Sequence, residues 1–177
     1  MKKALLLLLT ILIVAGLTLL AVMYANDAME AGHVHLEVVA AARDDRALGV
    51  ISTLAQGWDD PGSAEWQRYY RGSEALFKAF REDDKDFVCI PVTVRVTSDS
   101  SDTLNFTDVQ VEGAECFVDW GEFVGATTKI MSGFTDHRTL PVILRAEDVP
   151  AEMTLTFRVR PRPLWDFAAA PLMFTAE

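Results

Sequence analysis

An uncharged apolar stretch, residues 4–24, constrains this chain more than any other feature of its sequence. Only Thr10, Gly16 and Thr18 interrupt its apolar side chains. A helix rises about 1.5 Å per residue, so roughly 20 such residues cross a hydrocarbon core about 30 Å thick. The stretch predicts a transmembrane anchor within residues 1–25, with Tyr24 as an aromatic residue at the membrane interface.

The alternative to an anchor is a cleaved signal sequence, whose apolar core is shorter, at about 7–15 residues. Ala25 fits the last position before a cleavage site, but Met23 fits poorly two residues earlier. No cysteine follows the apolar core in the way that lipid attachment requires. We therefore expect an uncleaved anchor, whereas cleavage near Ala25 would give a secreted protein.

The charges that flank the apolar stretch predict its orientation. Lys2 and Lys3 precede it, and Asp27 and Glu30 follow it. Basic residues tend to stay on the cytoplasmic side of a membrane. The expected topology is a single-pass membrane protein with a cytoplasmic N-terminus and with residues 26–177 extracytoplasmic.

The exported part of the chain is strongly acidic. Beyond residue 25 it carries 26 acidic and 14 basic residues, a formal net charge of −12. Such a charge repels nucleic acid and anionic lipid headgroups at long range. The composition therefore argues against a nucleic-acid partner and suits either solubility or a cationic partner.

The two cysteines, Cys89 and Cys116, both lie in the exported part. An oxidising compartment would let them pair, and we expect a disulfide between them. Two buried free thiols are the alternative. Neither cysteine has a histidine spaced to activate it, so a catalytic thiol is not expected.

Residues 26–85 are expected to form a mainly helical, membrane-proximal region, although the sequence leaves helix and strand open over residues 28–56. Residues 33–38 alternate as a strand does, while the flanking segments favour a helix. The spacing of Ala47, Val50, Ile51 and Leu54 predicts a short amphipathic helix.

A second amphipathic helix is predicted over residues 64–82, with Ser63 as its N-cap. Aromatic side chains recur along it at steps of three and four residues. Most such faces pack on a core, and an exposed docking face for a partner is the alternative. The candidate interaction residues are Trp66, Tyr69, Tyr70, Phe77 and Phe80.

From residue 86 the hydrophobic period changes to two. Residues 88, 90, 92, 94 and 96 are apolar, and residues 153, 155, 157 and 159 repeat the pattern. Several short strands joined by turns predict an antiparallel β-sandwich over residues 86–177. An apolar tail, residues 161–177, is expected to cover one sheet edge, or else to meet a partner.

Two segments carry a resemblance to a known family. Residues 87–106, with a Val/Thr strand, a Ser/Asp turn and Leu104-Asn-Phe106, and residues 149–159, with a strand after Val149-Pro150, resemble the telokin-like, immunoglobulin-like domains of bacterial lipoproteins and anchored surface proteins. The resemblance covers residues 86–160 and implies an immunoglobulin-like fold and an extracytoplasmic location. It brings no catalytic residues. The absent lipid-attachment cysteine and the preceding aromatic helix depart from that family.

No pattern of residues predicts a cofactor, a metal or catalysis. His33 and His35 lack a third ligand, and His137 lacks a patterned serine nucleophile. We expect a non-enzymatic, membrane-anchored module that binds another envelope or surface protein. A structural subunit of a membrane or pilus-like assembly is the alternative, although the processing residues of a pilin are absent, and a metal-dependent envelope enzyme ranks third.

Overall fold

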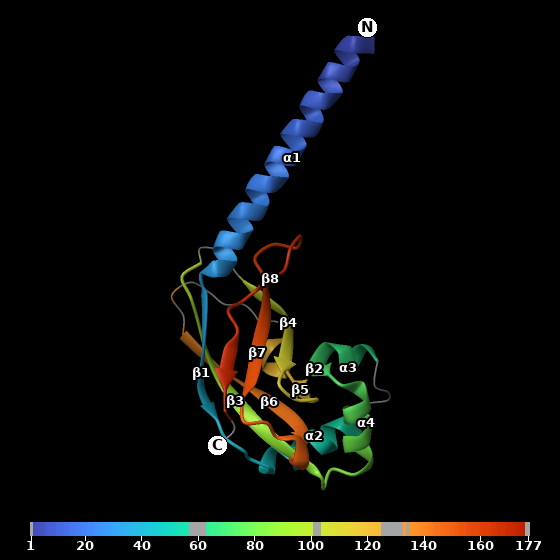
Figure 1. Ribbon diagram of the computed structural model, residues 1–177, viewed down its shortest axis with the longest axis vertical. Coiled ribbons are helices and arrows are strands. Elements are labelled where there is room, and N and C mark those ends of the chain that lie inside the picture. The colour runs from blue at the N-terminus through green and yellow to red at the C-terminus, as the bar shows by residue number, and fades with distance from the viewer. Residues whose placement is uncertain (1, 57–62, 101–103, 125–132, 134, 176–177) are drawn as a thin grey trace.

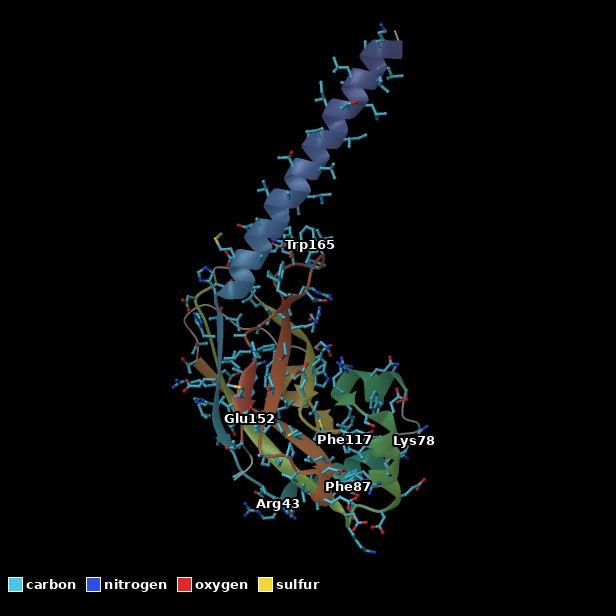
Figure 2. The ribbon with its side chains drawn as sticks, in the orientation of Figure 1. Arg43, Lys78, Phe87, Phe117, Glu152 and Trp165 are labelled. Carbon is cyan, nitrogen blue, oxygen red and sulfur yellow. The ribbon has the colours of Figure 1, made fainter. Side chains whose placement is uncertain are left out.

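The computed structural model describes residues 2–56, 63–100, 104–124, 133 and 135–175. The first helix, α1 (Lys2–Gly32), projects from the rest of the chain as a single rod (Figure 1). Along its apolar stretch the side chains point outward (Figure 2), and none of its most apolar 18-residue window is buried. The C-terminal end of the helix contacts the β domain, through Tyr24 and the buried Ala31. The helix is long and apolar enough to cross a membrane.

The larger of two antiparallel sheets has five strands in the order β1-β3-β6-β5-β2. These strands are β1 (Val34–Ala41), β3 (Phe87–Ser98), β6 (Thr135–Arg145), β5 (Phe117–Asp119) and β2 (Tyr70–Gly72). The long pair of β3 and β6 forms its centre, from Phe87 opposite Arg145 to Thr97 opposite Thr135.

The smaller sheet is built around β7 (Met153–Arg160). One edge of β7 pairs with β4 (Asn105–Glu112), and the other edge pairs with β8 (Phe167–Ala168) and β9 (Leu172–Phe174). The apolar tail thus supplies two short strands that cover one edge of β7. The prediction of a mainly β, antiparallel fold after an apolar helix is confirmed.

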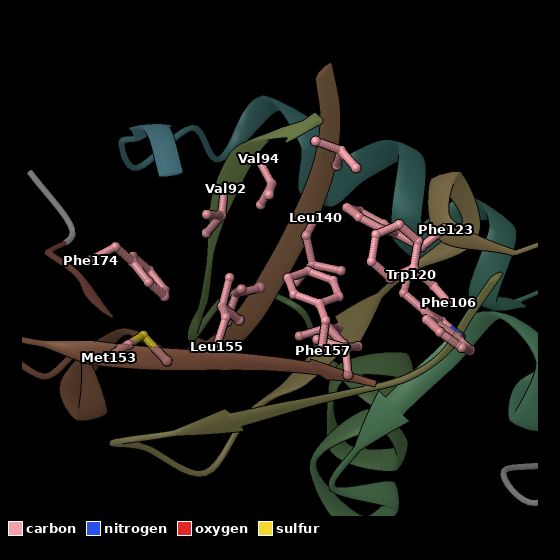
Figure 3. Close-up of a cluster of buried hydrophobic side chains, with 14 of the residues drawn as sticks. Val92, Val94, Phe106, Trp120, Phe123, Leu140, Met153, Leu155, Phe157 and Phe174 are labelled. Carbon is pink, nitrogen blue, oxygen red and sulfur yellow. The ribbon is translucent and has the colours of Figure 1, made fainter. Parts of the chain in front are cut away.

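The main core lies between the two sheets. Val92 and Val94 of β3 and Leu140 of β6 face Leu155 and Phe157 of β7 (Figure 3), and all five are 0% exposed. Alternation places every second side chain of a strand on one face, which explains why the predicted inward residues of β3 and β7 are buried in this core.

Three short helices cover part of the outer face of the larger sheet. They are α2 (Arg46–Gln56), α3 (Ala64–Tyr69) and α4 (Glu74–Glu82), grouped at the end of the domain away from α1 (Figure 1). Under them lies a second core that includes Phe87, Phe117 and Ile143 of the sheet. The sheet is therefore buried on both faces here, and β3 begins with four buried residues in a row.

The helix predicted over residues 64–82 is two helices with a strand between them. Gly72 separates them with φ +105°, and Ser73 then caps α4 by accepting from the Leu76 N–H. A Cβ at Gly72 would lie 2.3 Å from the Cys116 carbonyl oxygen. The break therefore comes from close packing of this segment against β5, which periodicity does not register.

Residues 26–85, expected to be mainly helical, also contain the strands β1 and β2 beside their helices. α1 continues to Gly32, and β1 then runs antiparallel to β3 as an edge strand of the larger sheet. The alternation of residues 33–38 was therefore a correct strand signal. In α2 the buried face is Leu48 and Ile51, whereas Val50, placed on the apolar face by spacing, is 64% exposed.

Candidate functional site

The aromatic residues proposed as an interaction face are core residues, which corrects that hypothesis. Trp66, Tyr70, Phe77 and Phe80 are 6%, 0%, 1% and 1% exposed, and Tyr69 is half-buried. The Phe77 ring packs 4.9 Å from Tyr70 and 5.2 Å from Phe117 of β5, measured between ring centroids. These side chains cover the apolar residues on the outer face of the sheet and remove them from water.

The expected disulfide is likewise corrected, since Cys89 and Cys116 are free and buried. Cys89 lies opposite Ile143, which lies opposite Phe117, so two strand spacings, roughly 10 Å, separate these backbones. Cys89 shares the outer face with Ile143 and Phe117, while Cys116 belongs to the core on the opposite face. A disulfide needs Cα atoms within about 7 Å and side chains that converge.

Burial also makes both thiols poor nucleophiles. It raises the pKa of Cys89 to about 12, with the nearby carboxylates of Asp45 and Asp44 adding to the effect. It raises the pKa of Cys116 to about 12, with Glu115 adding to it. A thiol that keeps its proton neither attacks a substrate nor binds a metal at neutral pH.

The three histidines are not brought together. His35 on β1 and His137 on β6 both lie on the outer face of the larger sheet, but β3 runs between them. Glu37, Arg95 and His137 form one row across the strands, and His35 lies 3.7 Å from Asp99. Among the described residues no group of three or more His, Cys, Asp or Glu side chains could hold a metal.

A groove with a volume of about 460 Å³ lies at one side of the β domain. It lies between β2, at one end of the larger sheet, and β4, at the edge of the smaller sheet. We call it the edge groove. Its lining residues are Arg71, Gly72, Ser73, Asp108, Val109, Gln110, Val111, Glu112, Ala114, Glu115, Cys116 and Val118.

An ion pair joins the two sheets at the edge groove. Arg71 of β2 donates from Nε to Asp108 of β4 at 2.9 Å, and the two side chains are 27% and 32% exposed. The guanidinium also stacks over the Trp120 ring, 4.2 Å from its centroid, and donates to the Tyr70 carbonyl at 2.6 Å. Arg71 is therefore held in one position by an aromatic ring, a carboxylate and a carbonyl.

The remaining charges of the edge groove are negative. Glu115 accepts a hydrogen bond of 2.6 Å from the Ser73 hydroxyl, and Glu112 is exposed at the end of β4. Since Asp108 is paired with Arg71, two carboxylates stay without a cation among the lining residues. The floor is apolar and includes Val109 and Val118, which are 2% and 1% exposed. An acidic rim over an apolar floor favours a ligand that is cationic and partly apolar.

Each strand beside the edge groove has one open edge. In the described part of the chain β4 pairs with β7 alone and β2 with β5 alone. An open edge presents main-chain N–H and C=O groups that a further extended segment can bind. The sequence did not indicate β2 as an open edge strand, because Arg71 fell within a predicted helix. The Gly72-Ser73 pair was the one local signal of the break.

No protein-family model matches the chain, and neither a curated protein nor a solved structure matches it.

Proposed function

We propose that this chain is a membrane-anchored, non-enzymatic binding module of the cell envelope, with its β domain on the extracytoplasmic side. Its ligand is an extended segment of another envelope or surface protein that carries Lys or Arg residues. The observation that carries this proposal is the edge groove, an acidic, apolar-floored cavity between two open sheet edges.

The anchor rests on α1 and on the way the helix continues into the domain. Its uncharged stretch follows Lys2 and Lys3, which favours a cytoplasmic N-terminus. Helical backbone runs unbroken through Ala25, the candidate cleavage site, and Tyr24 packs against Trp165. These contacts support retention of the helix over its removal.

We assign the two-sheet domain to the immunoglobulin-like sandwiches, in line with the resemblance to telokin-like domains. Two antiparallel sheets around one apolar core support the assignment. The third layer of helices over the larger sheet is an addition to that plan. Domains of this class serve many functions, so the binding role is argued from the edge groove and not from the fold.

Main-chain pairing and charge would act together in the edge groove. A segment laid along β4 gains hydrogen bonds from the strand edge, and side chains on one of its faces reach the apolar floor. Lys or Arg residues on the segment would meet Glu112 and Glu115. The net charge of −12 beyond residue 25 would speed the approach of a cationic partner.

Photo-crosslinking in cells tests the binding mode. A photo-reactive amino acid at Gln110, which is exposed in the middle of β4, is compared with the same group at Val50 on α2. We expect an adduct from Gln110 alone, mapped to a basic segment of one partner, and its loss in a Glu112→Lys, Glu115→Lys variant.

Other outcomes separate the competing functions. An adduct with a second copy of this chain would favour the structural subunit of an assembly. Equal adducts from Gln110 and Val50, or an adduct that survives the charge reversal, would rule out recognition in the edge groove.

A further inference from the structure

The loop between β7 and β8, residues 161–166, lies beside the end of the apolar stretch of α1. The ring of Trp165 packs edge-on against Tyr24, with centroids 5.5 Å apart, and Phe167 packs against the same ring at 5.3 Å. The loop rises from the domain toward α1 (Figure 1), and Trp165 is at that junction (Figure 2). A segment distant in the sequence thus reaches the level at which α1 would leave the hydrocarbon.

Hydrogen bonds and ion pairs hold this loop in place. At its base Arg160 donates to Asp166 from Nε and Nη2, at 2.8 and 2.9 Å, and the Thr107 hydroxyl donates to the same carboxylate at 2.9 Å. Further along, Arg162 Nε lies 3.4 Å from an oxygen of Asp27, whose side chain is 0% exposed. The loop is therefore fixed against α1 one helical turn beyond Tyr24.

The tip of the loop is apolar and uncovered. Leu164 is 58% exposed, Pro163 is exposed, and Trp165 is only partly buried. Trp and Tyr are the side chains most enriched at membrane–water interfaces, because their rings are apolar with one polar edge. Leu164 and Trp165 beside Tyr24 have the composition of a surface that enters the headgroup region.

We propose that the β7–β8 loop docks on the lipid bilayer that α1 crosses, with Leu164 and Trp165 in the headgroup region. The proposal rests on α1 being a membrane anchor, and it adds a second membrane contact to the first. The bilayer is the partner that we assign to this loop, because the uncharged stretch of α1 ends at Tyr24 and Tyr24 packs on the loop. Two contacts would fix the tilt of the domain and hold the edge groove at a constant height above the membrane.

Fluorescence quenching on the full-length protein in phosphatidylcholine vesicles tests this proposal. Leu164→Cys is labelled with an environment-sensitive dye; the native cysteines are 0% and 7% exposed and compete little for it. Val50→Cys on α2 is the control for a water-exposed position, and Leu12→Cys in α1 the control for a membrane-buried one. Quenching lipids carry bromine either near the headgroup or near the bilayer centre.

We expect the dye at Leu164→Cys to show blue-shifted emission and stronger quenching by headgroup-proximal bromine than by central bromine. The dye at Val50→Cys should emit as in water and resist both quenchers. If Leu164→Cys behaves like Val50→Cys while Leu12→Cys is quenched by central bromine, docking of the loop is overturned and the anchor stands. If Leu12→Cys is not quenched either, the anchor itself fails, and the docking with it.

Discussion

Gly72 is the residue on which the local geometry of the edge groove depends. Its φ of +105° favours glycine, and an added Cβ would lie 2.3 Å from the Cys116 carbonyl oxygen. We expect Gly72→Ala to lower the free energy of unfolding by about 3 kcal/mol or more, because a backbone clash adds to an unfavourable φ. Denaturant unfolding of the full-length protein in detergent measures the loss.

Gly133 provides the matched control. It also has a positive φ, +76°, but a Cβ there would meet no atom of the described residues within 4 Å. Gly133→Ala should therefore cost only the conformational part, about 1 kcal/mol. Equal losses for the two variants would contradict the close approach of Gly72 to β5.

The two buried thiols predict a loss of stability in alkali. Their ordinary pKa of 9.0 is raised to about 12 in the folded protein, so between these values the unfolded chain has released protons that the folded chain keeps. The free energy of unfolding should fall as pH rises from about 9 to 12, by up to about 1.4 kcal/mol per pH unit for each thiol. Below pH 9 the thiols should contribute no slope.

A Cys89→Ala, Cys116→Ala double variant checks this origin of the pH dependence. Its unfolding midpoint should fall less steeply between pH 9 and 12 than that of the parent protein. A reducing agent should leave the parent midpoint unchanged at pH 7. A lower unfolding midpoint after reduction would support a disulfide between Cys89 and Cys116 and contradict the free thiols.

At the scale of elements, substitutions in α4 distinguish a helix that packs on the core from a helix that docks a partner. Phe77 is 1% exposed and contacts three other rings, while the neighbouring Lys78 is exposed. Phe77→Ala should lower the free energy of unfolding by about 3–5 kcal/mol, because it leaves a cavity between helix and sheet. Lys78→Ala should change it by less than about 0.5 kcal/mol. Thermal unfolding of both variants measures these losses. A near-neutral effect of Phe77→Ala would contradict the burial of this aromatic face in the core.

The Arg71–Asp108 ion pair is the element-scale link between β2 and β4. Because both side chains are partly shielded, we expect a coupling free energy of about 0.5–1 kcal/mol between Arg71→Ala and Asp108→Ala. A double-mutant cycle from denaturant unfolding gives this value. Zero coupling would mean that the two sheet edges are not joined through these side chains.

Element types were predictable where one periodicity dominated. The alternation in β3 and β7 has a period of two over eight residues or more, and the residues that the pattern placed inward are buried. The pattern also placed Cys89 outward, and this side chain is buried because the helices cover that face of the sheet. The aromatic run of residues 64–82 has helical spacing throughout, so the short strand β2 within it could not be inferred. That strand exists because of its pairing with β5, a contact between residues distant in the sequence.

At the scale of the molecule, the sequence indicated an apolar helix followed by antiparallel sheets but not the strand order. The edge groove depends on that order, since it exists because β2 and β4 are the outermost strands on the same side. The disulfide expectation failed for the same reason. Pairing of Cys89 and Cys116 depends on faces and registers that local patterns do not reveal.

The central claim is that α1 holds the β domain outside the cytoplasm, and cysteine accessibility tests it most directly. Val50→Cys places one exposed thiol on α2, Lys3→Cys places one before the apolar stretch, and both native cysteines are buried. A membrane-impermeant maleimide is added to osmotically stabilised cells before and after permeabilisation. We expect Val50→Cys to react in intact cells, and Lys3→Cys to react only after permeabilisation. Labelling of Lys3→Cys but not of Val50→Cys in intact cells would contradict the topology.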